Sequence, residues 1–216
     1  MPTPDEYQEA LILVTAQAVR DVVDAADQLD SEELVLAGAT LIAVYSEGAA
    51  ALGADQYDDL REASQANRAY LAEPVVNLRD TKIERGLRWA AGPLYGDEPD
   101  VEVGRARLAE VVQFETARPF RDTTLFNRQR DPSAVGWRRN SNDGCKFCRL
   151  LASNGATYKE STARFASHPN CDCTAVPVFS DDEGPEASVL QYVASQRRKT
   201  PAQRQALNRY LAALPD

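Results

Sequence analysis

Four cysteines and a single histidine are the residues of this 216-residue chain whose types and spacing could do chemistry. They occur as Cys145-Lys146-Phe147-Cys148 and, after nineteen further residues, as His168-Pro169-Asn170-Cys171-Asp172-Cys173. A C-x-x-C turn presents two thiolates to one tetrahedral ion, and a second pair on a returning segment completes the coordination, as in structural zinc sites. The pattern therefore predicts one structural Zn²⁺ held by ligands from this set of five side chains.

The spacing of the residues does not decide which two side chains form the second ligand pair. Cys145 and Cys148 form the first pair, and three groups compete for the two remaining places. Cys171 and Cys173 would point to the same face of an extended backbone, which favours a site of four cysteines. His168 and Cys171 have the H-x-x-C spacing of a knuckle, which favours a site with one histidine. The side chain that is left out would support a ligand or remain a buried thiol.

Other chemistry fits these residues less well. The N-terminus lacks the layout of a signal peptide and no apolar run has the length of a membrane span, so we expect a cytosolic product without a membrane segment, in which disulfides are disfavoured. A zinc deaminase needs H-x-E before P-C-x-x-C, whereas here the C-x-x-C comes first. With His168 assigned to the metal, no Ser-His-Asp or Cys-His pair remains, and the sequence has no G-x-x-x-x-G-K-[ST] loop. The sequence therefore predicts no catalytic residues.

The elements that must position the metal site begin with a predicted helical hairpin. Thr3-Pro4-Asp5-Glu6 and Asp30-Ser31-Glu32-Glu33 both have the pattern of a helix start, and apolar residues follow each of them at steps of three and four. The second helix is expected to stop at Gly53, because glycine commonly ends helices.

Three further helices are predicted before residue 131. They cover residues 55–71, a segment that begins at Asn77 with Asp80 and ends at Gly92-Pro93, and residues 100–130, in which Pro119 should bend or break the helix.

From residue 134 onward, short mixed segments replace the helices. Strand-like pieces at 134–138 and 174–179 enclose the cysteines, which predicts a small module organised by the metal. An acidic linker follows at 180–186, and Thr200-Pro201-Ala202-Gln203 repeats the capping pattern before a short amphipathic helix. This helix is expected either to dock on a partner protein or to pack back on its own chain. The predicted fold is mainly α: an N-terminal helical hairpin and long helices, then a small α+β zinc-knuckle module and a C-terminal helical tail.

The net charge of −9 is distributed unevenly. Residues 1–60 contain thirteen acidic residues and one arginine, which argues against a cellular zinc-knuckle protein that binds nucleic acid. Residues 104–140 contain eight arginines and four acidic residues. This basic stretch predicts at most weak, non-specific contact with DNA phosphates, and a solvated helix surface explains it at least as well. The arginines considered for that contact are Arg105, Arg107, Arg118, Arg121, Arg128, Arg138 and Arg139.

The segment from Trp137 to Phe179 resembles the phage Mu F-type (MuF-like) minor head protein family. A tryptophan-bearing strand leads into the C-K-F-C motif, the H-P-N-C-D-C motif follows, and the segment ends in a proline-containing strand, T-A-V-P-V-F. Members of the family typically show these features after a long helix with Arg and Glu near its middle. Arg107-Leu108-Ala109-Glu110 stands where that helix is expected, so the resemblance covers residues 100–180.

The resemblance implies a structural role in a phage head. Such a minor capsid protein is made in the host cytoplasm and packaged inside the head, commonly with the portal, and it acts in head assembly and in DNA packaging or delivery. Its expected partners are the portal, the major capsid protein or the scaffolding protein. The alternative from another class is a capsid maturation protease or another head-processing enzyme, which the assignment of His168 to the metal disfavours.

This view divides the chain into four parts. They are an N-terminal helical region at 1–98, a MuF-like head morphogenesis domain with the metal knuckle at 99–179, the linker at 180–186 and the helical tail at 187–216.

Overall fold

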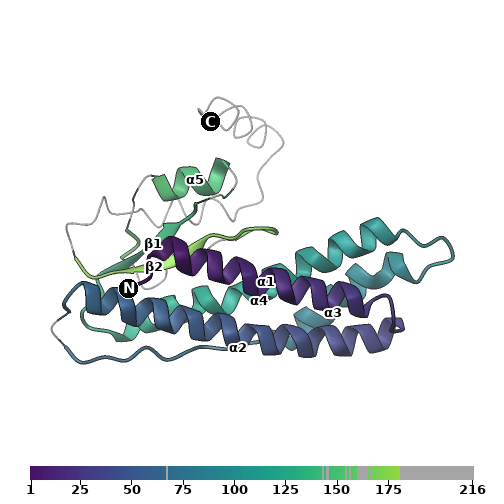
Figure 1. Ribbon diagram of the computed structural model, residues 1–216, viewed down its shortest axis with the longest axis horizontal. Helices are drawn as coiled ribbons and strands as arrows, with labels where there is room; N and C mark the ends of the chain where they lie inside the picture. Colours follow the sequence, from purple (N-terminus) through teal and green to yellow (C-terminus); the bar gives the residue numbers. More distant parts are fainter. Residues whose placement is uncertain are drawn as a thin grey trace.

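The structure is a computed structural model that describes residues 1–66, 68–142, 144, 146–153, 155, 157–159, 165 and 167–180. Within these residues long helices lie side by side and a two-stranded sheet packs on them (Figure 1), which confirms the mainly α fold. The elements are α1 (Pro4–Ala25), α2 (Ser31–Ala63), α3 (Asp80–Ala91), the 3-10 turn η1 (Gly92–Leu94), α4 (Val101–Arg130), β1 (Gly136–Asn140), α5 (Lys146–Ser153) and β2 (Thr174–Val178). The predicted helical tail, most of the predicted linker and Cys145 lie outside the described residues.

Both helices of the predicted hairpin begin where their capping patterns placed them. At α1 the Thr3 amide donates to Glu6 Oε2 (2.6 Å) and the Glu6 amide donates to the Thr3 hydroxyl (3.3 Å). At α2 the Glu33 amide donates to the Asp30 carboxylate (2.9 Å) and the Asp30 amide donates to Glu33 Oε2 (3.2 Å). Each reciprocal pair satisfies amides that the first turn of a helix leaves without partners.

The second helix is longer than predicted. It runs through Gly53 to Ala63, so the expected stop at Gly53 and the separate helix over 55–71 are both wrong. A Cβ atom at position 53 would come within 2.7 Å of the Phe120 carbonyl oxygen. Glycine at this position therefore permits the close approach of α2 and α4 and does not end the helix. The chain turns at Gln65, whose φ of 54° is left-handed, a common way to leave a helix.

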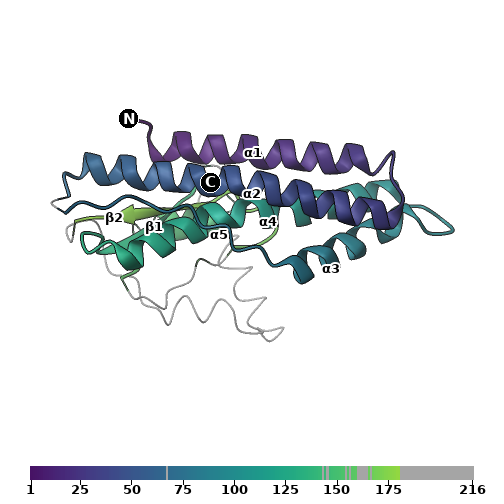
Figure 2. The same cartoon turned by 90° about the horizontal axis from the view of Figure 1, so that it is seen from below.

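Residues 70–79 form no helix or strand and run back along the helices to α3 (Figure 2). The side chain of Asn127 on α4 accepts a hydrogen bond from the Glu73 amide and donates one to the Glu73 carbonyl, both at 2.8 Å. Because bonds to α4 hold this segment outside a helix, α3 begins at Asp80 and the predicted start at Asn77 is wrong.

The last predicted helix forms as one continuous element. Pro119 lies inside α4 without breaking it, so the predicted break is wrong. A proline removes one helical hydrogen bond. Here α4 packs against α1, α2 and α3 and against both strands, and the residues on both sides of Pro119 are buried, so packing holds the helix through the missing bond.

The four helices α1, α2, α3 and α4, called the helical body below, share an apolar core. One cluster joins them through fully buried side chains that include Val22, Ile42, Leu87 and Leu108. In the part of the chain that the structure describes, α2 is the helix with the length and apolar composition of a membrane span. Some of its apolar residues, such as Leu34 and Ile42, are buried in the core cluster with α1, α3 and α4, whereas Leu36 and Val44 are exposed.

The strands form an antiparallel pair in which Gly136 lies opposite Val178 and Asn140 lies opposite Thr174. Both strands were predicted, at 134–138 and 174–179. They pack on α4, and α5 lies against β1 (Figure 1). We call β1, α5, β2 and the described residues between them the knuckle module.

Candidate metal centre

Three of the five predicted ligands lie together in the knuckle module. The Cys148 sulfur is 3.2 Å from His168 Nε2 and 3.8 Å from the Cys171 sulfur, and the three ligand atoms lie within 4.8 Å of one another. In a tetrahedral site with metal–sulfur bonds of about 2.3 Å, two sulfurs are separated by about 3.8 Å. The spacing of these atoms therefore fits a tetrahedral metal ion.

A tight turn and one hydrogen bond orient His168. Asn170 has a left-handed backbone (φ 57°), which asparagine tolerates better than most residues, and it forms the turn between His168 and Cys171. His168 Nδ1 lies 2.7 Å from the Pro169 carbonyl oxygen. If Nδ1 donates to that carbonyl, Nε2 carries no proton and can bind a metal on the side of the sulfurs.

The sulfurs come from two elements and lie in a closed environment. Cys148 belongs to α5, while Cys171 and Cys173 precede β2, and all three side chains are buried in one cluster. Gly144 lets the backbone approach this cluster, since a Cβ atom there would come within 3.0 Å of Cys148 Cβ. The local sequence thus encloses the three sulfurs on several sides.

The facing thiols differ in acidity. The hydrogen bond between them raises the pKa of Cys148 and lowers the pKa of Cys171, and the positive charge of Arg121 acts on Cys171 in the same direction. A thiolate is the form that binds metals, so the charge distribution favours metal binding at Cys171.

A catalytic pair and a disulfide fit this geometry less well. Cys148 is only 2 % exposed, whereas a nucleophilic cysteine must be reached by its substrate. A disulfide holds its sulfurs about 2.05 Å apart, whereas Cys148 and Cys171 are free thiols 3.8 Å apart. The donors fit a metal that prefers thiolate and imidazole ligands.

The structure narrows the question of the second ligand pair. His168 and Cys171 both face Cys148, and Cys173 is buried beside them in the same cluster. Cys145 lies outside the described residues. A fourth ligand would therefore come from Cys145 or Cys173.

Two side chains of α4 hold the ligand segment, a role that sequence patterns did not indicate. Gln113 Nε2 donates to the Cys171 carbonyl (3.1 Å) and to Asp172 Oδ1 (2.7 Å). Arg121 donates from Nε to the Cys173 carbonyl (2.8 Å) and from Nη2 to the Cys171 carbonyl. In the sequence, Gln113 and Arg121 are eight residues apart, which places them on one broad face of the helix. This spacing indicates a shared contact only when the position of β2 beside α4 is known.

Several arginines of the basic stretch are engaged within the protein. The contacts are Arg105 with Asp27 (2.7 Å), Arg118 with Asp122 (2.5 Å), Arg107 over the Trp89 ring (4.6 Å), and Arg128 with the carbonyls of Val135 and Lys159. Arg121 and Arg139 are buried. These contacts engage most of the arginines considered for DNA within the protein itself, so contact with phosphates stays a prediction with fewer groups to support it.

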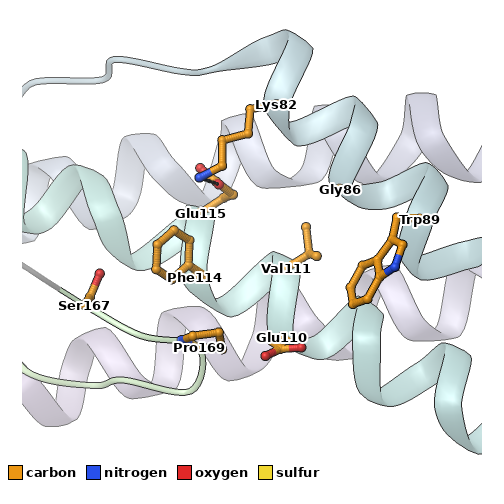
Figure 3. Close-up of a pocket in the computed structure, with 9 residues that line it drawn as sticks. All are labelled: Lys82, Gly86, Trp89, Glu110, Val111, Phe114, Glu115, Ser167 and Pro169. Carbon is orange, nitrogen blue, oxygen red and sulfur yellow. Dashed lines mark ion pairs between the residues drawn. The ribbon is translucent and has the colours of Figure 1, made fainter. Parts of the chain in front are cut away.

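A pocket of about 390 Å³ lies beside the loop that carries His168 (Figure 3). It is lined by Lys82, Gly86 and Trp89 of α3, by Glu110, Val111, Phe114 and Glu115 of α4, and by Ser167 and Pro169 of the loop. Lys82 reaches over the Phe114 ring to the Glu115 carboxylate (3.4 Å). Because Ser167 and Pro169 flank His168 in the sequence, a metal bound to His168 would fix one wall of the pocket.

The family resemblance placed an Arg and Glu pair of the long helix at Arg107 and Glu110. Arg107 stacks on Trp89 and Glu110 lines the pocket. The α4 side chains that contact the ligand segment are those of Gln113 and Arg121.

Comparison with known proteins gives one match. The family described as VG15 protein, a family of viral proteins, matches residues 3–199. Neither the curated proteins nor the solved structures contain a match.

Proposed function

Because the chain belongs to the VG15 protein family, a viral family, we propose that it is a structural protein of a virion, namely a minor protein of a tailed-phage head. The observation that carries the proposal is the extent of the match, which includes both the helical body and the candidate metal ligands. The MuF-like pattern of C-K-F-C and H-P-N-C-D-C supports the finer assignment to head morphogenesis.

We propose Zn²⁺ as the metal and a structural role for it. Cys148, His168 and Cys171 would bind the ion together with Cys145 or Cys173, and the bound ion would supply folding free energy to the module. The burial of Cys148 supports a structural site, since a catalytic zinc keeps one position open to substrate.

The proposed location is the interior of the head, with the portal, the major capsid protein or the scaffolding protein as partners. No enzymatic role is proposed, because the single histidine of the chain is placed 3.2 Å from a buried cysteine sulfur. Contact with packaged DNA is expected to be weak, since the guanidinium groups of Arg105 and Arg118 already pair with carboxylates.

Quantitative mass spectrometry of purified virions and procapsids tests the structural role. The protein should be present in both particles at a copy number well below that of the major capsid protein. Its absence from both particles would contradict the proposal. Presence in procapsids with loss from virions, together with uncleaved capsid protein when the gene is deleted, would favour the maturation protease.

Metal analysis tests the zinc centre. The full chain, purified without chelators, should contain about one equivalent of Zn²⁺. A clearly lower Zn²⁺ content in a chain whose cysteines are reduced would argue against the metal centre. The proposed role in the virion would be unaffected, because it is based on the family match.

A further inference from the structure

Arg121 is a buried cation whose polar contacts go to the backbone of two cysteines. It is 2 % exposed, and it donates to the carbonyls of Cys173 (2.8 Å) and Cys171. Among the described residues Nη1 has no hydrogen-bond partner. Within the same residues no carboxylate lies at ion-pair distance from this guanidinium, and the charge of Asp172 acts on it from farther away.

A guanidinium in this position needs a negative charge nearby. Removing a charge from water is unfavourable unless an opposite charge compensates it, and carbonyl oxygens supply hydrogen bonds without net charge. A zinc ion with three thiolates and one imidazole, or with four thiolates, is a net anion because the thiolate charges outweigh the two charges of the ion. The spacing of the cysteines and the histidine allows both of these ligand sets, and with either set the metal centre is an anion beside Arg121.

We infer that Arg121 is the counter-ion of the metal centre and the positioning residue that attaches the centre to α4. Its charge balances the metal-bound thiolates, and its two donors hold the Cys171 and Cys173 backbone. The inference rests on the proposed metal centre. Metal and arginine then stabilise each other, because the bound centre places a net negative charge beside the buried guanidinium of Arg121.

Gln113 provides a matched comparison. Its amide binds the same backbone segment, through the Cys171 carbonyl and the Asp172 side chain, but it carries no charge. Arg121→Met removes the positive charge but keeps a side chain of similar length. Arg121→Lys keeps the charge but loses the planar guanidinium with its several donors. Gln113→Met removes only hydrogen bonds from an uncharged group.

The first measurement is the Zn²⁺ affinity of the full chain, by competition with a chromophoric chelator at neutral pH. Loss of a residue that supports metal ligands commonly weakens binding by about 10–100-fold, and Arg121→Met should fall in this range. Arg121→Lys and Gln113→Met should each weaken binding clearly less. Equal losses for Arg121→Met and Gln113→Met, or for Arg121→Met and Arg121→Lys, would overturn the charge-balancing role.

The second measurement separates charge balance from packing. Thermal unfolding of the wild-type chain and Arg121→Met, each with and without Zn²⁺, should show a larger decrease in Tm for the variant in the zinc-loaded form than in the metal-free form, because both forms lose the hydrogen bonds of Arg121 but only the loaded form loses its charge balance with the bound centre. An equal decrease in both forms would overturn the inference. If Arg121→Met fails to fold, the Zn²⁺ affinities of Arg121→Lys and Gln113→Met are compared instead. A greater loss of Zn²⁺ affinity for Arg121→Lys than for Gln113→Met would overturn the charge-balancing role.

A failure of the metal centre itself has a different signature. A wild-type chain that binds no Zn²⁺ would remove the centre and, with it, the role of Arg121. If the wild-type chain and Arg121→Met bind Zn²⁺ equally tightly, the metal centre stands and only the role of Arg121 is overturned.

Discussion

The helical body and the knuckle module are stabilised by different means. In the body, side chains such as Ile42 and Leu87 are fully buried in clusters shared by several helices. In the module, the cluster around the candidate metal site contains, among the described residues, three cysteines and the partly buried Phe165. A cluster of this size contributes little free energy of folding by its own apolar burial, and other buried side chains of the module, such as Trp137 and Val176, lie on the strands that pack on α4. The module therefore depends on its attachment to the body, and the proposed metal would add to its stability.

The attachment between the two regions is α4. The predicted division at residue 98 assigns this helix to the MuF-like domain, yet α4 packs extensively on α1 and α2. The same helix donates hydrogen bonds from Gln113 and Arg121 to the ligand segment. A disturbance of the metal site is therefore expected to reach α4 first and the α1–α2 hairpin last.

Removing the metal should have the largest effect. Cys148→Ser, or chelation of the wild-type chain, forfeits a binding free energy of order 10 kcal/mol that structural zinc supplies at neutral pH. Hydrogen–deuterium exchange should show loss of protection in β1 and β2, while the amides of α1 and α2 stay protected. Chelation should leave the exchange of Cys148→Ser unchanged, which controls for effects of the chelator. A loss of protection spread evenly over all described elements would refute the two-region comparison.

Local chemistry made much of the body predictable from the sequence. The helix starts at Thr3 and Asp30 depend on side chains three residues away, and both were predicted. The errors fall where distant segments meet. Gly53 faces the backbone of α4, and Pro119 is held within a helix that is packed on several others, and neither circumstance is visible in nearby residues.

The candidate site was predictable in its ligands and not in its surroundings. Cysteine and histidine are rare in this chain, so the cluster of Cys148, His168 and Cys171 stood out by composition and spacing. Arg121 was one of eight arginines in a basic stretch for which a solvated helix surface, ion pairs within the chain and weak contact with DNA were all considered. Its contact with Cys171 spans fifty positions of sequence and depends on where α4 meets the knuckle module.

A substitution in the body should lower stability without changing the metal site. Ile42 is fully buried in the core cluster, so Ile42→Ala should reduce the free energy of unfolding by about 2–5 kcal/mol through lost burial and an unfilled cavity. Val44→Ala is the matched control on the same helix, because Val44 is 59 % exposed and its loss should change stability by only about 0.5 kcal/mol.

Urea unfolding followed by circular dichroism measures both variants. The Zn²⁺ affinity of Ile42→Ala under native conditions should equal that of the wild type. A parallel loss of Zn²⁺ affinity would mean that body and module are not stabilised separately.

Two glycines of α2 give opposite predictions. Gly48 has open space around it, so Gly48→Ala should raise the free energy of unfolding by up to about 1 kcal/mol through better helix propensity. Gly53→Ala should lower it by about 1–3 kcal/mol, because the nearest atoms belong to the Phe120 backbone and cannot move aside as a side chain could. Thermal or urea unfolding compares the pair directly. Stabilisation by Gly53→Ala would show that α2 and α4 can separate at little cost.

The smallest predicted effect lies where the body meets the module. The Tyr57 ring of α2 packs edge-on against Phe179 (5.5 Å between centroids), and its hydroxyl donates to Asp131 (3.4 Å). Burial, and then the negative charge of Asp131, raise the pKa of Tyr57 above its ordinary value. A raised pKa means that the folded state prefers the neutral phenol. Its stabilising contribution is therefore complete below the unfolded pKa of about 10 and is lost as pH rises above that value.

Tyr57→Phe should accordingly lower the free energy of unfolding by about 0.5–1.5 kcal/mol at neutral pH, the value of a typical hydrogen bond. Urea unfolding from neutral pH to about pH 11 should then show the difference between wild type and variant narrowing above the ordinary tyrosine pKa, about 10. Tyr45→Phe is the matched control, since the Tyr45 hydroxyl donates to Asp21 within the body. If Tyr57→Phe loses stability with rising pH as steeply as the wild type, ionisation of Tyr57 does not weaken this contact, and other groups cause the loss of stability at alkaline pH.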